Sequence, residues 1–179
     1  MFHVRNIKVS VKVKALILNN ALNKLHQKFI PTRHFGNFIS FKHNGYTFVL
    51  FKKGKRRDSH VNVTQIPNFA CIHRAIASLI KLIECEVLHY TVDNIIATSD
   101  LNRTLSLKEV VKHIKFKKIK YNSEIFPGVF IRFKRGTVIL FHSGKLVIVG
   151  CRSIDNLRWI VNLIHVHMKK LLKTIEKEL

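Results

Sequence analysis

Alternating apolar and polar positions predict a run of short strands between residues 125 and 150, whose sequence is IFPGVFIRFKRGTVILFHSGKLVIVG. Successive side chains of a strand point to opposite faces of its sheet. One face of these strands is apolar, and its members are Val129, Ile131, Phe133, Val138, Leu140, Leu146 and Ile148. The opposite face is mostly apolar as well, with Phe130, Ile139, Phe141, Val147 and Val149 among Arg132, Lys134, Thr137 and Lys145. The pattern therefore predicts a sheet with two apolar faces.

The chain repeats itself with a period of about 90 residues. Three pairs of segments carry the match: 4–7 (VRNI) with 92–95 (VDNI), 38–42 (FISFK) with 130–134 (FIRFK), and 50–55 (LFKKGK) with 140–145 (LFHSGK). The offset between the paired segments stays between 88 and 92 residues. We therefore expect two repeats, residues 1–88 and 89–179, in a pseudo-twofold molecule.

Each repeat predicts the same order of elements: a strand, a helix, three or four short strands and a long helix. Ser106 and Glu109 have capping-box spacing at the first helix of the second repeat, and Asn19 is the cap expected in the first repeat. The long helices are expected to begin near Asn68 and near Ser153. Their apolar stripes are ordinary core faces, formed by Ile72, Ile76, Leu79, Ile80 and Ile83 and by Leu157, Ile160, Ile164, Met168 and Leu171. The expected fold class is α+β.

These helices are too few to cover both faces of the sheet, and an exposed apolar surface usually marks a binding site. The alternative is a sandwich or a dimer that buries the second face. The net charge of +22, from 32 Lys and Arg against 10 Asp and Glu, favours a polyanion as the partner. A basic surface that only keeps the protein soluble is the plainer alternative.

The partner should offer both apolar surface and phosphate, as the minor groove of DNA does. A major-groove reader would show a basic recognition helix, and the sequence contains none. An RNA-recognition sheet is a competing hypothesis because it also presents aromatic residues on an open face. The Lys/Arg-Gly-Phe-Gly-Phe-like strand of that motif is absent, however.

Other classes of function have little support in the sequence. Residues 143–145 (SGK) lack the upstream glycine and the following Ser or Thr of a phosphate-binding loop. His165 and His167 are two residues apart on a predicted helix and point in different directions, so they do not indicate a metal site. The three cysteines form no CxxC pair, which indicates a reducing compartment. We expect no enzymatic activity, cofactor, small-molecule substrate or membrane association.

Three stretches of the second repeat together resemble the TATA-box-binding protein family. Residues 92–101 (VDNIIATSDL) resemble the first strand of a family repeat, and residues 121–128 (YNSEIFPG) resemble its stirrup loop. Residues 140–147 (LFHSGKLV), followed by Gly150, resemble the Phe-x-Ser-Gly-Lys strand pair. The resemblance covers residues 90–172, whereas over residues 1–88 the order of the strands fits better than the residues do.

The resemblance implies a saddle in which the two repeats form a curved antiparallel sheet, with helices on the convex face and DNA under the concave face. It implies a general transcription initiation factor that binds and bends A·T-rich, TATA-like DNA. Its partners would be double-stranded DNA and general transcription factors or RNA polymerase subunits. Phenylalanine rings would enter base steps at each end of the site, and the corresponding residues are Phe35, Phe51, Phe126 and Phe141.

The resemblance also implies roles for other residues. The minor-groove base contacts would come from Asn6, Asn94, Ile96, Val147, Val149 and Thr64. The phosphate contacts would come from Arg132, Lys145, Lys55 and Lys134. Glu124 and Ile125 would lie where the family docks its initiation factor of the B type. The asparagines suit A·T pairs, because these pairs show only hydrogen-bond acceptors in the minor groove.

The first repeat departs from the family pattern. Lys8 and Asn62 stand where the family has apolar residues, and Ser40 replaces the phosphate-binding arginine of the second repeat. Residues 56–60 (RRDSH) are expected to form an inserted charged loop. These differences support an alternative, a related interaction protein that has lost DNA bending and binds transcription factors. They also suggest a virus-encoded or parasite version, acting in the nucleus or at a viral transcription site in the cytoplasm.

Overall fold

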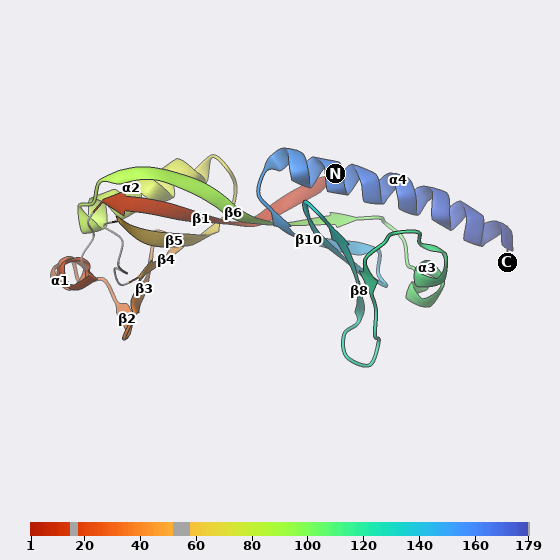
Figure 1. The fold of residues 1–179 in the computed structure, drawn as a ribbon, viewed down its shortest axis with the longest axis horizontal. Coiled ribbons are helices and arrows are strands. Elements are labelled where there is room, and N and C mark those ends of the chain that lie inside the picture. Colours follow the sequence, from red (N-terminus) through yellow and green to blue (C-terminus); the bar gives the residue numbers. More distant parts are fainter. Residues whose placement is uncertain (15–17, 52–57, 179) are drawn as a thin grey trace. The chain divides into compact units, whose positions relative to one another are not determined.

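A computed structural model of the protein describes residues 1–14, 18–51 and 58–178 (Figure 1). In chain order, the described elements are β1 (Phe2–Lys14), α1 (Leu18–Gln27), β2 (Thr32–Phe35), β3 (Phe38–His43), β4 (Tyr46–Phe51), β5 (Asp58–Ile66), α2 (Cys71–Ile83), β6 (Val87–Asp100), α3 (Leu107–His113), β7 (Ile119–Lys120), β8 (Gly128–Phe133), β9 (Gly136–Phe141), β10 (Lys145–Cys151) and α4 (Ile154–Glu178). The order strand, helix, strands, helix occurs twice, as the sequence predicts.

The strands are hydrogen-bonded in the order β2-β3-β4-β5-β1-β6-β10-β9-β8-β7. The chain divides into two compact units, an N-terminal unit of residues 6–93 and a C-terminal unit of residues 94–179 together with residues 1–5. Strands β1 and β6 each contribute residues to both units. The first five residues therefore complete the sheet of the unit that is formed mainly by the second repeat.

In the N-terminal unit, α2 packs on one face of the strands and α1 packs against α2 and β3. The buried residues of this layer include Val9, Val11, Leu25, Ile39, Phe48, Leu50, Val61, Val63, Ile72, Ala75, Leu79 and Ile83. The carboxamide of Asn68 accepts a 3.1 Å hydrogen bond from the N–H of Cys71 at the start of α2. Asn19 lies inside α1 and is exposed, so the prediction that it caps this helix is wrong. Leu18, one residue earlier, is already helical and is buried.

In the C-terminal unit, α4 packs against β9 and β10, and α3 packs against α4 and β8. Of the strand residues predicted to face the helices, all but Phe133 are buried. Phe133 is half-buried and meets the ring of Trp159 on α4 edge-on at 6.0 Å. The predicted cap of α3 is confirmed, and α4 begins at Ile154, next to Ser153, as expected. The hydroxyl of Ser106 accepts from the N–H of Glu109 at 3.5 Å, and that of Ser153 accepts from the N–H of Asn156 at 3.2 Å.

The strand registers correct one part of the predicted repeat alignment. Phe51 pairs with Phe38 in the first repeat, and its counterpart Phe141 pairs with Gly128 in the second. Both hairpins turn through two residues, so β3 and β4 align with β8 and β9 at an offset of 90 residues. The predicted match of residues 38–42 with residues 130–134, at an offset of 92, is therefore wrong by two residues. A shift of two keeps every side chain on the same face, so alternation alone cannot detect it.

This register changes three equivalences. Phe38 is equivalent to Gly128, and Ser40 is equivalent to Phe130. Lys42, not Ser40, is then the counterpart of Arg132, so the first repeat keeps a cation at that position. Residues 58–60 of the predicted charged loop belong to β5, which begins at Asp58, whereas residues 56 and 57 lie outside the described residues.

Candidate nucleic-acid interface

We call the sheet face opposite the helices the open face of each unit. In the C-terminal unit its residues include Asn94, Ile96, Thr98, Phe130, Thr137, Ile139, Phe141, Val147 and Val149. In the N-terminal unit they include Asn6, Lys8, Ser10, Phe38, Ser40, Thr47, Val49, Asn62 and Thr64. All of these side chains are partly exposed, whereas their neighbours along each strand are mostly buried. Each unit thus presents one packed face and one accessible face.

Three phenylalanines cluster at one end of the C-terminal open face. The ring centroid of Phe126, in the loop before β8, lies 5.9 Å from that of Phe141 and 5.0 Å from that of Phe130. Gly128 makes room for this cluster, because a Cβ added there would lie 2.9 Å from Cε1 of Phe126 and 3.3 Å from Cε1 of Phe141. The absence of a side chain at residue 128 allows the rings to lie against the backbone.

A matching cluster occupies the N-terminal open face. The ring of Phe38 lies 5.9 Å from that of Phe51 and stacks at 4.8 Å on that of Phe35. Phe35 is 49% exposed and Phe51 is 39% exposed. Phe38 was not among the predicted site residues, yet it stands beside Phe51 at the strand position that Gly128 occupies in the other repeat. The short hairpin Phe35-Gly36-Asn37-Phe38 was the sequence signal that could have revealed it.

Asn6 and Asn94 make the same unusual contact in the two units. The Oδ1 of Asn94 accepts a 2.6 Å hydrogen bond from the N–H of Gly150, and the Oδ1 of Asn6 accepts a 2.9 Å bond from the N–H of Gln65. Both donors have positive φ, 82° at Gly150 and 63° at Gln65, and both lie where the strand register shifts. Each carboxamide oxygen is thus occupied by backbone. The NH₂ group remains as the donor available at the open face.

The remaining predicted contact residues lie on the open face or at its edges. Ile96, Val147 and Val149 form part of the C-terminal face, and Thr64 lies beside Thr47 on the N-terminal face. Among the predicted cations, Arg132, Lys134 and Lys145 are exposed at strand ends or turns. Lys55 lies outside the described residues. By strand register, His60 takes the place of Lys145 in the first repeat.

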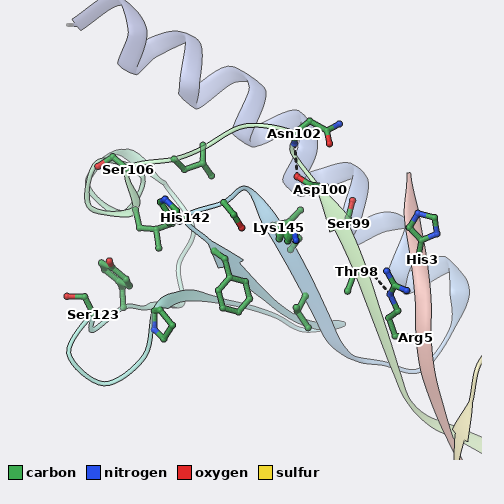
Figure 2. A pocket seen from close by; sticks show the side chains of 18 of the residues that line it. His3, Arg5, Thr98, Ser99, Asp100, Asn102, Ser106, Ser123, His142 and Lys145 are labelled. Atoms are coloured by element: carbon green, nitrogen blue, oxygen red, sulfur yellow. Dashed lines mark hydrogen bonds between the residues drawn. The ribbon is translucent and has the colours of Figure 1, made fainter.

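A groove of about 1110 Å³ continues the C-terminal open face (Figure 2). Phe141, Val147, Tyr121 and Pro127 line it together with the basic side chains His3, Arg5, Lys108, His142 and Lys145. Arg5 was not predicted as a site residue. Its Nε donates a 3.0 Å hydrogen bond to the hydroxyl of Thr98, which brings a guanidinium group onto the open face. Pairing between β1 and β6, invisible in local sequence, positions this arginine.

The loop of residues 121–127 carries the predicted protein contacts. Asn122 organises it, because its carboxamide oxygen accepts from the N–H of Glu124 at 3.0 Å and its backbone carbonyl accepts from the N–H of Phe126 at 3.0 Å. Glu124 is exposed, and Ile125 is 79% exposed. The loop thus holds one ring toward the open face and presents an unpacked apolar side chain to solvent.

The other titratable groups do not form a catalytic arrangement within the described residues. No group of three or more His, Cys, Asp or Glu side chains there could hold a metal ion. Burial raises the pKa of the thiols of Cys85 and Cys151, so neither is an activated nucleophile. Burial lowers the pKa of His165, whose Nε2 lies 2.8 Å from the hydroxyl of Ser99. None of the described helices is long and apolar enough to cross a membrane.

The protein is thus of the α+β class, with two repeats that each carry an accessible sheet face and an aromatic cluster on that face. Methanococcus jannaschii TBP, a solved structure, shares this fold with a TM-score of 0.77 at 21% identity, over 94% of this chain and 98% of that chain. The fold predicted from the sequence is therefore confirmed. Residues 89–171 match the family model described as transcription factor TFIID (or TATA-binding protein, TBP). Over these residues, a little under half of the chain, the sequence is thus similar to the TATA-box-binding protein family.

Relatives at moderate identity show the same similarity. TATA-box-binding protein 1 of Methanosarcina acetivorans is 32% identical over 114 residues, which cover 59% of this chain and 60% of that protein. TATA-box-binding protein of Thermococcus celer is 37% identical over 82 residues, which cover 45% and 42%. The chain thus aligns with about half the length of these relatives. The family description is that of a transcription factor, which agrees with the expectation that the chain is not an enzyme.

Proposed function

We propose that this protein binds A·T-rich double-stranded DNA through the minor groove, bends it and acts as a general transcription initiation factor. The observation that carries the proposal is the recurrence, in both repeats, of an aromatic cluster and a backbone-anchored asparagine on the open face. We also propose that the two repeats, residues 1–88 and 89–179, act as the two DNA-binding domains.

The aromatic clusters would act as wedges. Phe126 and Phe141 are held together at the C-terminal face, and Phe38, Phe51 and Phe35 are held together at the N-terminal face. Unstacking a base step costs about a few kcal/mol for minor-groove wedge proteins, of which this family is itself an example. The cost is offset by the larger surface that the bent DNA touches, and flexible TA steps reduce it.

The asparagines would favour A·T pairs. Adenine N3 and thymine O2 are acceptors, whereas guanine adds an amino donor. Asn6 and Asn94 each use their oxygen to accept from a backbone N–H, so the NH₂ donors would be the groups that face the groove. A guanine amino group at either position would then face another donor.

The exposed cations would contact the phosphates that border the groove. Arg5, Lys42, Arg132, Lys134 and Lys145 are accessible around the two open faces. Their number suits a protein of net charge +22, and each phosphate contact adds to the salt dependence of binding. The exposed Ile125 and Glu124 suit the docking of a general transcription factor or a polymerase subunit. The protein would act wherever the transcribed DNA lies, in the nucleus or at a cytoplasmic transcription site.

A second candidate function is that of a related protein that has lost DNA bending and binds transcription factors. The observation in its favour is the polar character of the N-terminal open face, where Lys8 and Asn62 replace the apolar Ile96 and Val147 of the other repeat.

Energy transfer between the ends of a short labelled A·T-rich duplex tests the main proposal. We expect a shortened end-to-end distance on adding wild-type protein, lost in Phe126→Ala and Phe141→Ala and absent on a G·C-rich duplex. Phe29→Ala is the matched control, because Phe29 is 92% exposed in the turn after α1. Binding that leaves the duplex straight, equal on both sequences and steep in salt, would refute the proposal and favour the second candidate.

A further inference from the structure

The N-terminal open face carries a cluster of four polar side chains that the C-terminal face lacks. The hydroxyl of Ser10 donates to Oδ2 of Asp93 at 2.5 Å and lies 2.9 Å from the carboxamide oxygen of Asn62. The ammonium group of Lys8 lies 3.5 Å from the same carboxylate oxygen. All four residues belong to the N-terminal unit.

The equivalent positions of the second repeat have a different chemistry. The strand registers place Ile96 at the position of Lys8 and Val147 at that of Asn62. Arg5, which contacts Thr98, corresponds to Asp93, which contacts Ser10. One face is therefore apolar with a cation, whereas the other carries a carboxylate with an ammonium group beside it.

The carboxylate of Asp93 keeps acceptor capacity toward the groove. An ionised carboxylate has about four lone-pair sites. The cluster uses Oδ2 for Ser10 and Lys8, and the hydroxyl of Thr91 lies 3.4 Å from Oδ1. The side chain of Asp93 is 33% exposed and that of Lys8 is 37% exposed. Both a donor and an acceptor are thus accessible on this face.

An acceptor on this face is mismatched with A·T pairs and matched with G·C pairs. The minor-groove edge of an A·T pair has only acceptors, so Asp93 finds no donor there. The edge of a G·C pair carries the guanine amino group between acceptors, which complements the carboxylate of Asp93 and the ammonium group of Lys8. We infer that the N-terminal repeat reads a G·C pair through Asp93, so the protein recognises an asymmetric site with one A·T-only half and one G·C-containing half. This inference rests on the proposed minor-groove function.

Inosine provides the sharpest probe, because it lacks the amino group of guanine and leaves the rest of the pair unchanged. We would measure Kd at fixed salt on four bent-site duplexes: all A·T, G·C in one half, I·C at the same position, and G·C in both halves. Wild-type protein should bind the single G·C duplex at least as tightly as all A·T and about tenfold more tightly than I·C. G·C in both halves should weaken binding by tenfold or more.

Variants of Asp93 test whether the polar cluster causes the preference for G·C over I·C. Asp93→Ala should bring the ratio of the G·C and I·C affinities to about one, and Asp93→Asn should give an intermediate ratio while preserving the packing. Asp155→Ala is the matched control, because Asp155 is an exposed carboxylate on α4. It removes the same charge, so it should raise affinity on all duplexes alike and leave the ratio unchanged.

Two results would overturn the inference. Tighter binding to I·C than to G·C would mean that the amino group is rejected in both halves, and an unchanged ratio in Asp93→Ala would mean that another group reads it. The all A·T duplex separates these failures from failure of the proposed function. If the protein neither bends the all A·T duplex nor binds it more tightly than the duplex with G·C in both halves, the proposed function itself is refuted, and this inference with it.

Discussion

Asn94→Asp separates two roles of the Asn94 side chain, which are to accept a backbone hydrogen bond and to donate one to a base. The oxygen of Asn94 accepts from the N–H of Gly150, and an aspartate in the same conformation keeps that bond while losing the NH₂ donor. A hydrogen bond to a charged acceptor contributes about 1.5–3 kcal/mol, compared with about 1 kcal/mol for a neutral one. We therefore expect the free energy of unfolding to stay within about 1 kcal/mol of wild type. Asn94→Leu, which leaves the Gly150 N–H without its acceptor, should lose about 1–3 kcal/mol.

The affinity for DNA, unlike the stability, should fall in Asn94→Asp. The aspartate presents an acceptor to the acceptors of an A·T pair, so the hydrogen bond is lost at a cost of about 1–3 kcal/mol. This corresponds to an increase in Kd of about 5- to 150-fold. Guanidinium chloride unfolding gives the stability, and fluorescence anisotropy on an A·T-rich duplex at fixed salt gives Kd.

Asn122→Asp is the matched control for this substitution. The carboxamide oxygen of Asn122 also accepts a backbone hydrogen bond, from Glu124, but it does so in the loop before β8. Both variants therefore add one negative charge and keep one acceptor. If Asn94→Asp binds A·T-rich DNA as tightly as Asn122→Asp does, the NH₂ group of Asn94 does not face the bases, and the reasoning is refuted.

Two further predictions concern packing and pH. Gly128→Ala places a Cβ 2.9 Å from Cγ2 of Ile139 and from Cε1 of Phe126, so we expect urea unfolding to report a loss of about 1–3 kcal/mol and energy transfer to report a smaller bend. Unchanged values of both would show that Gly128 does not hold the ring. Burial lowers the pKa of His165 below its ordinary value of 6.5, so the folded state disfavours protonation of this ring. The contribution of the neutral ring to the free energy of unfolding is therefore present above pH 6.5 and is lost as the pH falls through the lower folded-state pKa. His165→Gln should lose less stability than wild type between pH 7.5 and 5.5 in urea unfolding, and an equal loss would contradict this assignment.

Periodicity and capping chemistry predicted much of the fold because both act over a few residues. The alternation along β8 to β10 separated the buried residues from the accessible ones, and the Ser106–Glu109 spacing identified the start of α3. The alignment of the two repeats failed by two residues at Phe38, because such a shift preserves the face of each side chain. Only the hydrogen-bond register distinguishes the two alignments.

The parts of the candidate site that the sequence did not reveal depend on contacts between distant segments. The pair formed by Lys8 and Asp93 and the bond from Arg5 to Thr98 join residues about 90 positions apart. The bond between Asn94 and Gly150 requires a register shift whose donor adopts positive φ. A single sequence carries no local signal for such contacts. Family resemblance could suggest the asparagine but not the orientation of its carboxamide.

Strands β1 and β6 each supply residues to both compact units, and this arrangement has an evolutionary consequence. A single ancestral repeat would have completed its sheet with the first strand of a second copy, as in a strand-exchanged homodimer. In such a dimer every substitution appears twice, so the two faces stay identical. A single chain with two repeats has no such constraint, and its equivalent positions carry Asp93 in one repeat and Arg5 in the other. A chain with two unequal halves has a polarity, and a bound site could therefore encode a direction along the DNA.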